Sequence, residues 1–479
     1  MKNLKDLMAN IEILETEGNM DVQVSSVSLN SQIIENGSLF TALVGNVVDG
    51  HKYIEKAIQN GAKVIVYETT RQDLVEFQDG VTYIKVADTH DAVAHLAINF
   101  YDNPSTKLKL VGVTGTNGKT TTVTLLYQIF TKLGYKVGMI GTTGNKIGND
   151  EIEGVRTTPD PVYLNKLLAQ MVAQGCEYCF MEVSSHAVSE KRITGLTFAG
   201  GVFTNLTHDH LDYHKTMENY RIAKKGFFDM LPAGAFALTN IDDENGEYML
   251  NATKAKKYTY SFKKPADFDE KIETKLIGEF NAYNALAIYG TAVLLGQNPE
   301  GKNTSYRASE IKEIIKNLDA PEGRFQYFKT KNNVTAIVDY AHTPDALENV
   351  LETIHKLKST NSKLITIIGC GGDRDKTKRP VMAGLGYAMS DILILTSDNP
   401  RSEKPEDILN DMQSGLPKEN NNKVYTILDR HEAVKKACMM AESGDYIAAL
   451  GKGHEKYQEV LGIKTHFDDM EELKKNLLN

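Results

Sequence analysis

Residues 111–122 read Val-Gly-Val-Thr-Gly-Thr-Asn-Gly-Lys-Thr-Thr-Thr and join a strand-like apolar run to a helix-like one. The expected strand covers 108–113, and the apolar residues after Thr120 recur at mostly helical spacing. Backbone N–H groups of a glycine-rich loop in this setting face an anion, Lys119 reaches terminal phosphates, and a Thr120 or Thr121 hydroxyl can bind Mg²⁺. The loop therefore predicts binding of ATP or GTP.

The loop departs from the usual P-loop spacing. That spacing requires glycine at position 113, whereas this chain has Val113 between Gly112 and Gly115. A Gly-Lys-Thr sequence also occurs in ordinary surface turns, but the two flanking runs favour a phosphate site. We therefore interpret the segment as a variant P-loop.

Composition narrows the class of protein. The chain has 479 residues, too many for one core, with 41% hydrophobic and 24% charged residues, as in ordinary soluble proteins. No apolar run reaches the length of a membrane span, so a cytoplasmic location is expected. The net charge of −9 argues against a nucleic-acid groove. Cys176 and Cys179 lie in an apolar run without a second pair, which favours buried thiols over zinc or redox chemistry.

The pattern along the chain predicts an α/β protein of three domains. Residues 1–103 mix short strands and turns with a helix at 53–60 that ends at Gly61, as expected of a small α/β domain. Strands and helices alternate through 104–322, which predicts a mainly parallel sheet. The same alternation over 323–479 predicts a third, Rossmann-like domain.

Three histidines and two aspartates lie together in residues 203–214. Zinc needs three or four converging ligands, and His208, His210 and His214 cannot meet at one point on a regular element. One of them, with Glu182, could instead complete a Mg²⁺ site beside the nucleotide phosphates. A cluster of hydrogen-bonded side chains on a loop is the alternative interpretation.

Two basic segments are further candidates. Lys224 and Lys225 are adjacent on an expected helix and must point in different directions, so one of them could turn inward. Residues 373–379 form a charged run after the glycine cluster 369–372 and the apolar strand 364–368. Such a run can be a solvated turn, but its place after a strand favours an anion site at the carboxyl edge of a sheet.

Together these segments resemble the Mur ligase family, the ATP-dependent amide-forming enzymes of bacterial peptidoglycan synthesis. The resemblance covers essentially the whole chain, and its motifs stand in the order of the family. The matching segments are residues 115–120, 157–159, 181–187, 204–205, 209–214, 278–284, 323–324, 338–344, 371–375 and 451–455.

Within the family the chain is most similar to the MurE type, which adds the third peptide residue to UDP-N-acetylmuramoyl-L-alanyl-D-glutamate. The resemblance implies that ATP phosphorylates the D-glutamyl γ-carboxylate and that the amine of the incoming amino acid then displaces phosphate. Such chemistry depends on positioning and on charge neutralisation by Mg²⁺ and lysine. The resemblance further implies a monomer with small-molecule substrates, no nucleic-acid partner and no membrane insertion.

The resemblance also assigns roles to residues. The catalytic residues are Lys119, Glu182, His210 and Lys224. Lys224 matches the family lysine that CO₂ converts to a carbamate, and the metal ligands are Thr120, Glu182, His210 and this carbamate. ATP-binding positions are Gly115, Thr116, Asn117, Gly118, Lys119, Thr120, Thr121, Asn281, Asn284, Arg324, Asp339 and His342. UDP-muramyl substrate positions are Ser31, Thr157, Thr158, Ser184 and Arg192. Amino-acid positions are Arg374, Asp398, Asn399, Arg401, Gly451 and Glu455.

The identity of the added amino acid depends on residues 398–401, which read Asp-Asn-Pro-Arg. In the family this tetrapeptide is similar to that of enzymes that add meso-diaminopimelate. That substrate has a second carboxylate, which lysine lacks, and the guanidinium of Arg401 can bind a carboxylate bidentately. Addition of L-lysine is the alternative, and Asn399-Pro400 could also form only a turn.

One segment departs from the family. Asn30-Ser31-Gln32 stands where the family commonly has Asp-Ser-Arg, so two opposite charges are lost and the details of UDP binding stay open. A folylpolyglutamate synthase would share the ligase core, but residues 157–159 and the expected UDP domain argue against it. A non-catalytic nucleotide switch is disfavoured because Lys119, Glu182, His210 and Lys224 are all retained.

Overall fold

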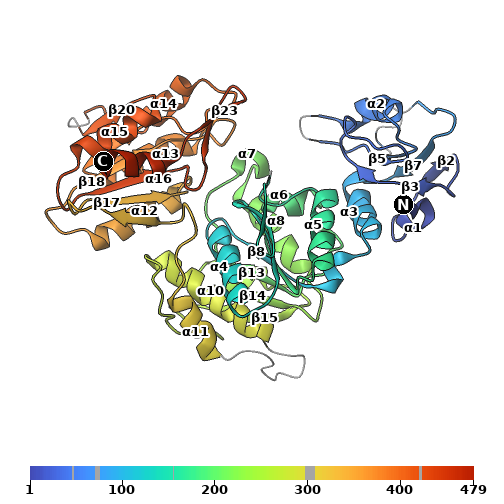
Figure 1. Cartoon of the computed structure of the whole chain (residues 1–479), viewed down its shortest axis with the longest axis horizontal. Helices are drawn as coiled ribbons and strands as arrows, with labels where there is room; N and C mark the ends of the chain where they lie inside the picture. Colours follow the sequence, from blue (N-terminus) through green and yellow to red (C-terminus); the bar gives the residue numbers. More distant parts are fainter. Residues whose placement is uncertain are drawn as a thin grey trace.

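A computed structural model describes the chain except for residues 46–47, 69, 71–75, 155, 297–307, 420–422 and 479. Three sheets, each with its own helices, follow one another along the chain, and the first and last groups lie on either side of the middle one (Figure 1). The α/β class and the three-part architecture are confirmed. The boundaries at 103–104 and 322–323 stay predictions.

The N-terminal sheet has the strand order β2-β7-β6-β5-β4, with β2 antiparallel at one edge. Its strands are β2 (Glu15–Glu17), β4 (Val27–Ser28), β5 (Leu39–Thr41), β6 (Val64–Glu68) and β7 (Thr82–Val86), beside the short pair β1 (Lys2–Asn3) and β3 (Gln23–Val24). The helical segments are α1 (Leu4–Leu7), η1 (Gly50–Tyr53), α2 (Ile54–Gln59) and α3 (Thr89–Phe100). The helix expected at 53–60 thus forms as α2, and Gly61 follows it with φ +114°.

The central sheet has eight strands in the order β11-β10-β9-β12-β8-β13-β14-β15. Among the strands described in this sheet, β10 alone runs opposite to the others, antiparallel to both β9 and β11, so the mainly parallel sheet is confirmed. The strands are β8 (Lys109–Thr114), β9 (Val137–Gly141), β10 (Gly144–Ile147), β11 (Asp150–Ile152), β12 (Tyr178–Glu182), β13 (Gly200–Phe203), β14 (Phe236–Asn240) and β15 (Lys256–Tyr260). Because β12 and β13 flank β8, Glu182 lies beside Val113 and Phe203 beside Thr114, next to the phosphate loop.

Helices cover both faces of this sheet. One face packs against α4 (Lys119–Lys132), α10 (Glu279–Gly296) and α11 (Ala308–Lys316). The other face packs against α5 (Pro161–Ala173), α6 (Ser185–Ser189), α8 (Met217–Asp229) and α9 (Gly246–Met249), and α7 (Leu211–His214) precedes α8. Local sequence explains α5: the Asp160 side chain accepts from the N–H groups of Val162 and Tyr163, and Pro161 takes the first helical position. The apolar residues of α5 that recur at helical spacing are buried, namely Leu164, Leu167, Leu168 and Met171.

The C-terminal sheet has the order β16-β17-β21-β18-β19-β20, with only β16 antiparallel. Its strands are β16 (Gln326–Lys329), β17 (Thr335–Asp339), β18 (Leu364–Ile368), β19 (Ile392–Leu395), β20 (Val424–Thr426) and β21 (Tyr446–Leu450), followed by the hairpin β22 (Tyr457–Val460) and β23 (Ile463–His466). One face packs against α12 (Pro344–Leu357), α13 (Lys378–Met389) and α14 (Pro405–Gln413), and the other against α15 (Arg430–Met440) and α16 (Asp469–Leu477). The loops after four parallel strands meet at one edge.

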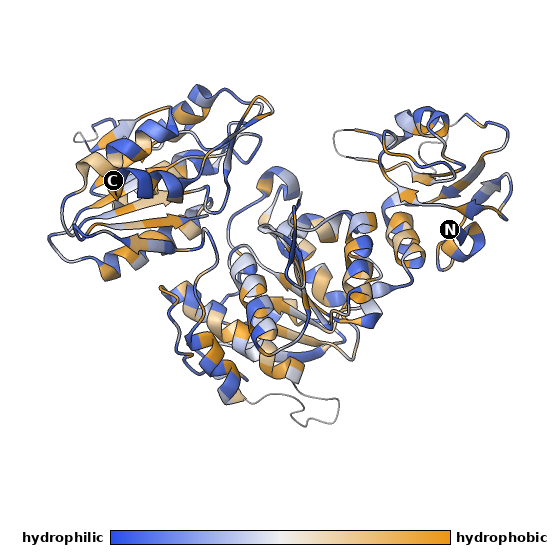
Figure 2. Cartoon of the chain, viewed as in Figure 1, coloured by the Kyte–Doolittle hydropathy of each residue, from blue (hydrophilic) through white to orange (hydrophobic). Residues whose placement is uncertain are grey.

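Hydrophobic residues concentrate in the strands and on the inner helix faces, while hydrophilic residues dominate the outer faces (Figure 2). Cys176 and Cys179 are free thiols, and burial raises the pKa of both, as predicted for structural cysteines. Among the helices described, none is both long and apolar enough to cross a membrane.

Candidate active site

The phosphate loop follows β8 and needs two of its glycines for packing. Gly115 and Gly118 have φ values of +152° and +85°. A Cβ on Gly115 would lie 1.8 Å from the Thr204 hydroxyl, and one on Gly118 would lie 2.4 Å from the Asn284 side-chain oxygen. Val113, where the usual spacing has glycine, is completely buried inside the strand. The loop therefore begins only after Val113, which explains the variant spacing.

Lys119, at the start of α4, folds back over this loop. Its ammonium donates hydrogen bonds of 2.9 Å to the carbonyls of Gly115 and Thr116. Burial lowers the pKa of Lys119, although Glu182 and Asp209 act in the opposite direction. A phosphate would offer this cation stronger acceptors than two carbonyls.

Lys224 is the lysine of α8 that turns inward, as the sequence allowed. It is 1% exposed, and its Nζ donates a 2.7 Å hydrogen bond to the Gly115 carbonyl. No carboxylate forms an ion pair with it in the part of the chain that the structure describes. Burial and the neighbouring Lys119 therefore hold the pKa of Lys224 well below its ordinary value. Lys225 points elsewhere and pairs with Asp229.

Glu182 ends β12 as a buried carboxylate. It accepts hydrogen bonds from the Thr142 backbone N–H at 2.8 Å and the Thr142 hydroxyl at 3.2 Å. No lysine or arginine among the described residues pairs with it, so its charge is available to another cation. The Thr158 hydroxyl donates to the Glu182 carbonyl, which ties the loop before α5 to this strand end.

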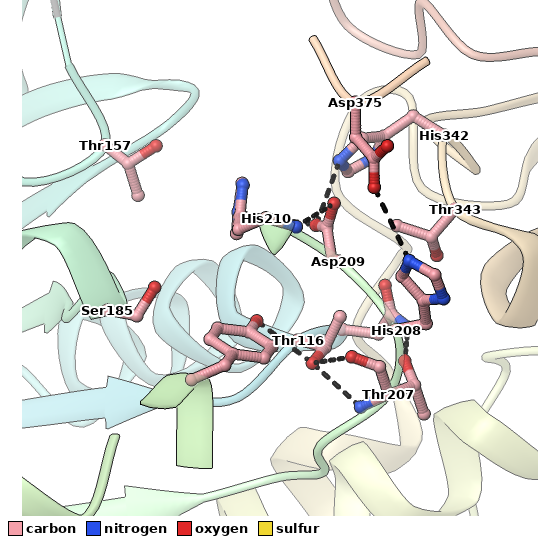
Figure 3. A network of polar contacts seen from close by, with 12 residues as sticks. Thr116, Thr157, Ser185, Thr207, His208, Asp209, His210, His342, Thr343 and Asp375 are labelled. Carbon is pink, nitrogen blue, oxygen red and sulfur yellow. Dashed lines mark hydrogen bonds and ion pairs between the residues drawn. The ribbon is translucent and has the colours of Figure 1, made fainter. Parts of the chain in front are cut away.

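The three histidines of residues 203–214 have different partners, and Figure 3 shows His208 beside Asp375 and His210 beside Asp209. His208 contacts Asp375 at 3.4 Å, and His214 hydrogen-bonds Ser185 at 2.8 Å. Only His210, held at a left-handed φ of 55°, lines the same cavity as Glu182 and Lys224. Burial lowers its pKa to about 3. No three His, Cys, Asp or Glu side chains are grouped to hold a metal unaided in the described ranges.

Asp209 connects the central and C-terminal domains. Its carboxylate lies 3.3 Å from His210 and 3.8 Å from His342 (Figure 3). The Lys378 ammonium lies 3.7 Å from the same carboxylate. Burial alone would raise the pKa of Asp209, but these neighbours hold that pKa well below its usual range. Burial lowers the pKa of His342 to about 4.

Two further contacts cross the same boundary. The Arg324 guanidinium donates to the Thr120 hydroxyl at 2.8 Å, and the Asn117 amide donates to Asp345 at 2.8 Å. Arg324 thus lies where it can reach the phosphate loop from the C-terminal domain. Of the four residues in these two contacts, the resemblance assigns only Thr120 to the metal site.

The predicted nucleotide residues of α10 and β17 flank a second cavity. Asn284, Thr121 and Asp339 line it, whereas Asn281 lies behind Asn284 and accepts its 3.2 Å hydrogen bond. The Asp339 carboxylate accepts from the Phe325 N–H at 2.6 Å, and burial raises its pKa to about 6. Asn281 is therefore one step removed from this cavity.

The loops after β18, β19 and β21 bring the predicted amino-acid residues together. Asn399 donates to the Glu455 carboxylate at 2.7 Å, and Arg401 donates from Nη1 to the Gly372 carbonyl at 2.7 Å. A Cβ on Gly451 would lie 2.8 Å from an Asp398 carboxylate oxygen. Arg374 and Arg401 line the same central cavity, which the phosphate loop also lines.

The predicted UDP-muramyl residues lie toward the N-terminal domain. Arg192 donates to the Thr158 carbonyl at 2.8 Å and pairs with Glu190. Ser31 is buried beside Asn30, whose side chain accepts from the Gln32 N–H and closes a turn.

Four cavities form a series in which each shares lining residues with the next. The α10 cavity shares Asn117, Gly118, Arg324 and Tyr340 with the central cavity. The central cavity shares Thr142, Thr157, Ser184, His210, Asp212, Tyr340, Arg374, Arg401 and Glu455 with the cavity beside β10, whose volume is about 840 Å³. Arg156 and Arg192 line both this β10 cavity and the N-terminal cavity around Ser31. The arrangement suits one long substrate and one nucleotide that meet in the central cavity.

Sequence reasoning missed several residues of this site. Asp209 and Lys378 stand inside motifs that the sequence singled out, but their contact across domains has no local signature. Thr142, which binds Glu182, lies in a turn between β9 and β10 without a distinctive pattern. Asp375 lies in the predicted anion loop, and its partner His208 comes from the histidine segment.

Three regions of the chain match known families of protein domains. Residues 23–101 match the Mur ligase family, catalytic domain; residues 113–292 match the Mur ligase middle domain; and residues 323–453 match the Mur ligase, glutamate ligase domain. These three regions comprise most of the chain.

Two similar proteins and one solved structure carry the same name. The UDP-N-acetylmuramoyl-L-alanyl-D-glutamate--2,6-diaminopimelate ligases of Bacteroides fragilis and Cytophaga hutchinsonii are each 50% identical, covering 98% and 97% of both chains. A solved structure of a ligase with the same name is 30% identical, with a TM-score of 0.66, and covers 99% of this chain and 98% of its own. The chain therefore belongs to the Mur ligase family, the ATP-dependent ligases that form amide bonds.

Proposed function

We propose that this protein adds meso-diaminopimelate to the D-glutamyl γ-carboxylate of UDP-N-acetylmuramoyl-L-alanyl-D-glutamate, with ATP as the energy source, in peptidoglycan biosynthesis. The names of relatives that are 50% identical over nearly the whole chain support this reaction. The observation that carries it is the central cavity, where the phosphate loop, Glu182 and Lys224 of one domain face Asp398, Arg401 and Glu455 of another. A carboxylate activated on one side would meet an amine held on the other.

The nucleotide half consists of the α10 cavity and the phosphate loop. Lys119 would exchange its two carbonyl partners for the β- and γ-phosphates, and Arg324 would approach the same phosphates from the C-terminal domain. Asn284 and Asp339 would contact the nucleoside. The substrate carboxylate attacks the γ-phosphorus, the bond to ADP breaks, and an acyl phosphate forms.

The residues present fit a magnesium site. Glu182 is buried without a cationic partner among the described residues, and a buried carboxylate in that state favours a bound cation. Thr120, Glu182, His210 and a carbamate on Lys224 would hold Mg²⁺, which would supply charge neutralisation at the phosphates. The low pKa of Lys224 supports carbamate formation, because CO₂ reacts with the neutral amine.

The amine half consists of the loops after β18, β19 and β21. Asp398 and Glu455 would bind an ammonium group, while Arg374 and Arg401 would bind the carboxylate that meso-diaminopimelate has and lysine lacks. Attack of the free amine on the acyl carbon expels phosphate and forms the amide. Low water content in the cavity would protect the acyl phosphate.

The UDP-muramyl substrate would lie along the β10 cavity and reach the N-terminal cavity. Thr157, Thr158, Ser184 and Arg192 line or border the first, and Ser31 lines the second. Asn30 and Gln32 would contact the uridine end without the charges common in the family.

Release of ADP by the purified protein tests this proposal. The assay contains ATP, Mg²⁺ and UDP-N-acetylmuramoyl-L-alanyl-D-glutamate, with meso-diaminopimelate, with L-lysine or with no amine. ADP release that depends on meso-diaminopimelate, with little response to lysine, is the expected result. Preference for lysine would contradict the assignment to Arg401, and no amine dependence would contradict the ligase reaction itself.

A further inference from the structure

A second buried lysine lies beneath the amino-acid residues. Lys452 follows Gly451 in the loop after β21, and its side chain is completely buried. Its Nζ lies 3.1 Å from the Asn399 side-chain oxygen, 3.5 Å from the Glu455 carboxylate and 3.7 Å from the Asp398 carboxylate. One cation therefore contacts three of the polar side chains that line this part of the cavity.

The contacts form a closed network. The Asn399 amide uses its oxygen to accept from Lys452 and its nitrogen to donate to Glu455. The same oxygen accepts from the Glu459 N–H at 3.0 Å, and Gln458 donates to the Asp398 carbonyl at 2.8 Å. Lys452 thus links the loop after β19 to the loop after β21 through side chains.

Lys452 does not line the central cavity, although its neighbours Gly451 and Glu455 do. The rings of Tyr457 and Phe467 lie 5.7 and 5.9 Å from its ammonium and help to separate it from solvent. A residue so enclosed cannot contact an incoming amino acid. Any effect on that substrate must pass through Asp398, Asn399 or Glu455.

We infer that Lys452 is a positioning residue of the amino-acid pocket: it orients Asp398, Asn399 and Glu455 and offsets part of the charge of the two carboxylates, which would bind an ammonium group of the substrate. This inference rests on the proposed function. Lys452 offsets one of the two carboxylate charges, the ammonium of an amino acid would offset the other, and Arg374 and Arg401 are left for its carboxylate. Without Lys452, the two carboxylates would repel each other, and Glu455 would take up a proton more readily.

The surroundings of Glu455 determine how this would appear in a pH profile. The charged and titratable groups around it are Asp398, Arg401, Arg430, Lys452, Tyr340 and Tyr457. Burial and Asp398 raise the pKa of Glu455, and Lys452 and Arg401 oppose that rise. Removal of the lysine therefore raises the pKa further and moves loss of amine binding to higher pH.

The test compares Lys452→Met with wild type in steady-state ADP release, with meso-diaminopimelate varied between pH 6 and 9. At pH 7 we expect KM for meso-diaminopimelate to rise about tenfold or more, while kcat and KM for ATP change by less than about threefold. The acid limb of kcat/KM for the amine should move up by about one pH unit.

Lys358→Met is the matched control. Lys358 is also largely buried in the same domain, where it contacts Asp391 at 3.1 Å and the Ser362 carbonyl at 2.8 Å, but it lines none of the four cavities. Its loss should leave the KM for the amine and the pH profile as in wild type. Equal changes in both variants would indicate a general loss of structure and would overturn the inference.

A second pair of variants covers failure of Lys452→Met to fold. Lys452→Met/Glu455→Gln removes one charge of each sign and is compared with Glu455→Gln alone. If Lys452 acts in part through Glu455, loss of Lys452 raises KM for the amine by a smaller factor in the Glu455→Gln background than in wild type; equal factors in the two backgrounds would overturn the inference. Wild type without amine-dependent ADP release would overturn the proposed function as well, whereas an active wild type with an unchanged Lys452→Met would overturn this inference alone.

Discussion

The floor of the phosphate loop and the floor of the amino-acid pocket each contain one buried lysine, and the two lysines have opposite surroundings. Lys224 contacts a backbone carbonyl and is repelled by the charge of Lys119, with no carboxylate paired to it in the described residues. Lys452 lies within 3.7 Å of two carboxylates and one amide oxygen. Burial alone therefore does not determine what a lysine does; its nearest charges do.

The difference suits Lys224 to a chemical reaction and Lys452 to a structural role. Burial without a counter-charge favours the neutral amine, which is a nucleophile. A buried ammonium between carboxylates instead satisfies their charge and restricts their movement. We expect substitutions at the two positions to affect different kinetic constants and to change stability in opposite directions.

The largest effect should come from Lys224→Ala. Loss of the amine removes the proposed carbamate, so kcat for ADP release should fall by about 10³-fold or more. Lys225→Ala, which removes the neighbouring lysine paired with Asp229, should stay within about twofold of wild type. Retention of more than a tenth of wild-type kcat in Lys224→Ala would contradict the role proposed for this lysine.

On the other side of the cavity, Arg401→Asn should alter selection of the amine. Asparagine tolerates the left-handed backbone at 401 but cannot bind a carboxylate bidentately. The ratio of kcat/KM for meso-diaminopimelate to that for L-lysine should fall by about 10²-fold, with KM for ATP unchanged. Lys404→Ala, a nearby exposed cation, provides the control, and an unchanged ratio in Arg401→Asn would remove the argument for this arginine.

The free energy of unfolding should change in opposite directions in Lys224→Met and Lys452→Met. In ligand-free protein depleted of CO₂, Lys224→Met should stabilise the fold by about 1–2 kcal/mol, because a buried amine without a counter-charge is replaced by an apolar side chain. Lys452→Met should destabilise it by about 3 kcal/mol, since it leaves two carboxylates uncompensated. Thermal or urea unfolding measures both values, and the same sign for the two would break the comparison.

The stabilisation expected for Lys224→Met depends on pH because the pKa of Lys224 is lowered in the folded protein. Below the folded-state pKa the lysine is protonated in both states, and its burial costs the full amount. The cost shrinks as pH rises toward the unfolded pKa of about 10.4. The gain from Lys224→Met should therefore be greatest near neutral pH or below and decline toward pH 10.

The smallest effect should come from removal of CO₂. Wild-type activity in degassed buffer should fall several-fold and return when bicarbonate is added, since carbamates form reversibly. Supply of ¹³CO₂ should give one carbamate signal in ¹³C NMR spectra, absent from Lys224→Ala and retained in Lys452→Met. A signal that persists in Lys224→Ala would assign the carbamate to another amine.

Much of the fold was accessible from local pattern. The start of α5 at Asp160-Pro161, the phosphate loop before α4 and the alternation that gives parallel sheets each depend on neighbours in sequence. The site was harder to predict from the sequence, because tertiary packing determines which side chains enter it. The divergence of Lys224 and Lys225 was predictable, whereas the inward direction of Lys224 depends on how α8 packs on the sheet.

Contacts between domains were not predictable from one sequence. The meeting of Asp209 with Lys378 and His342 requires the fold of two separate sheets. Lys452 stands in a Gly-Lys-Gly-His-Glu segment that has the composition of a solvated loop, and only the structure shows the two carboxylates around it. Family resemblance supplied what local pattern could not for Lys224 and the amino-acid residues.

Under the role proposed for Arg401, its backbone limits how easily evolution can change the amine. Its φ is 53°, and its own N–H and carbonyl are fixed to the β22–β23 hairpin through Glu459 and Leu461. β-Branched residues are strongly disfavoured at such a φ, whereas asparagine, aspartate and glycine are tolerated. A lineage that drifts toward another amine can therefore sample only part of the amino-acid alphabet at this position, unless the hairpin changes first.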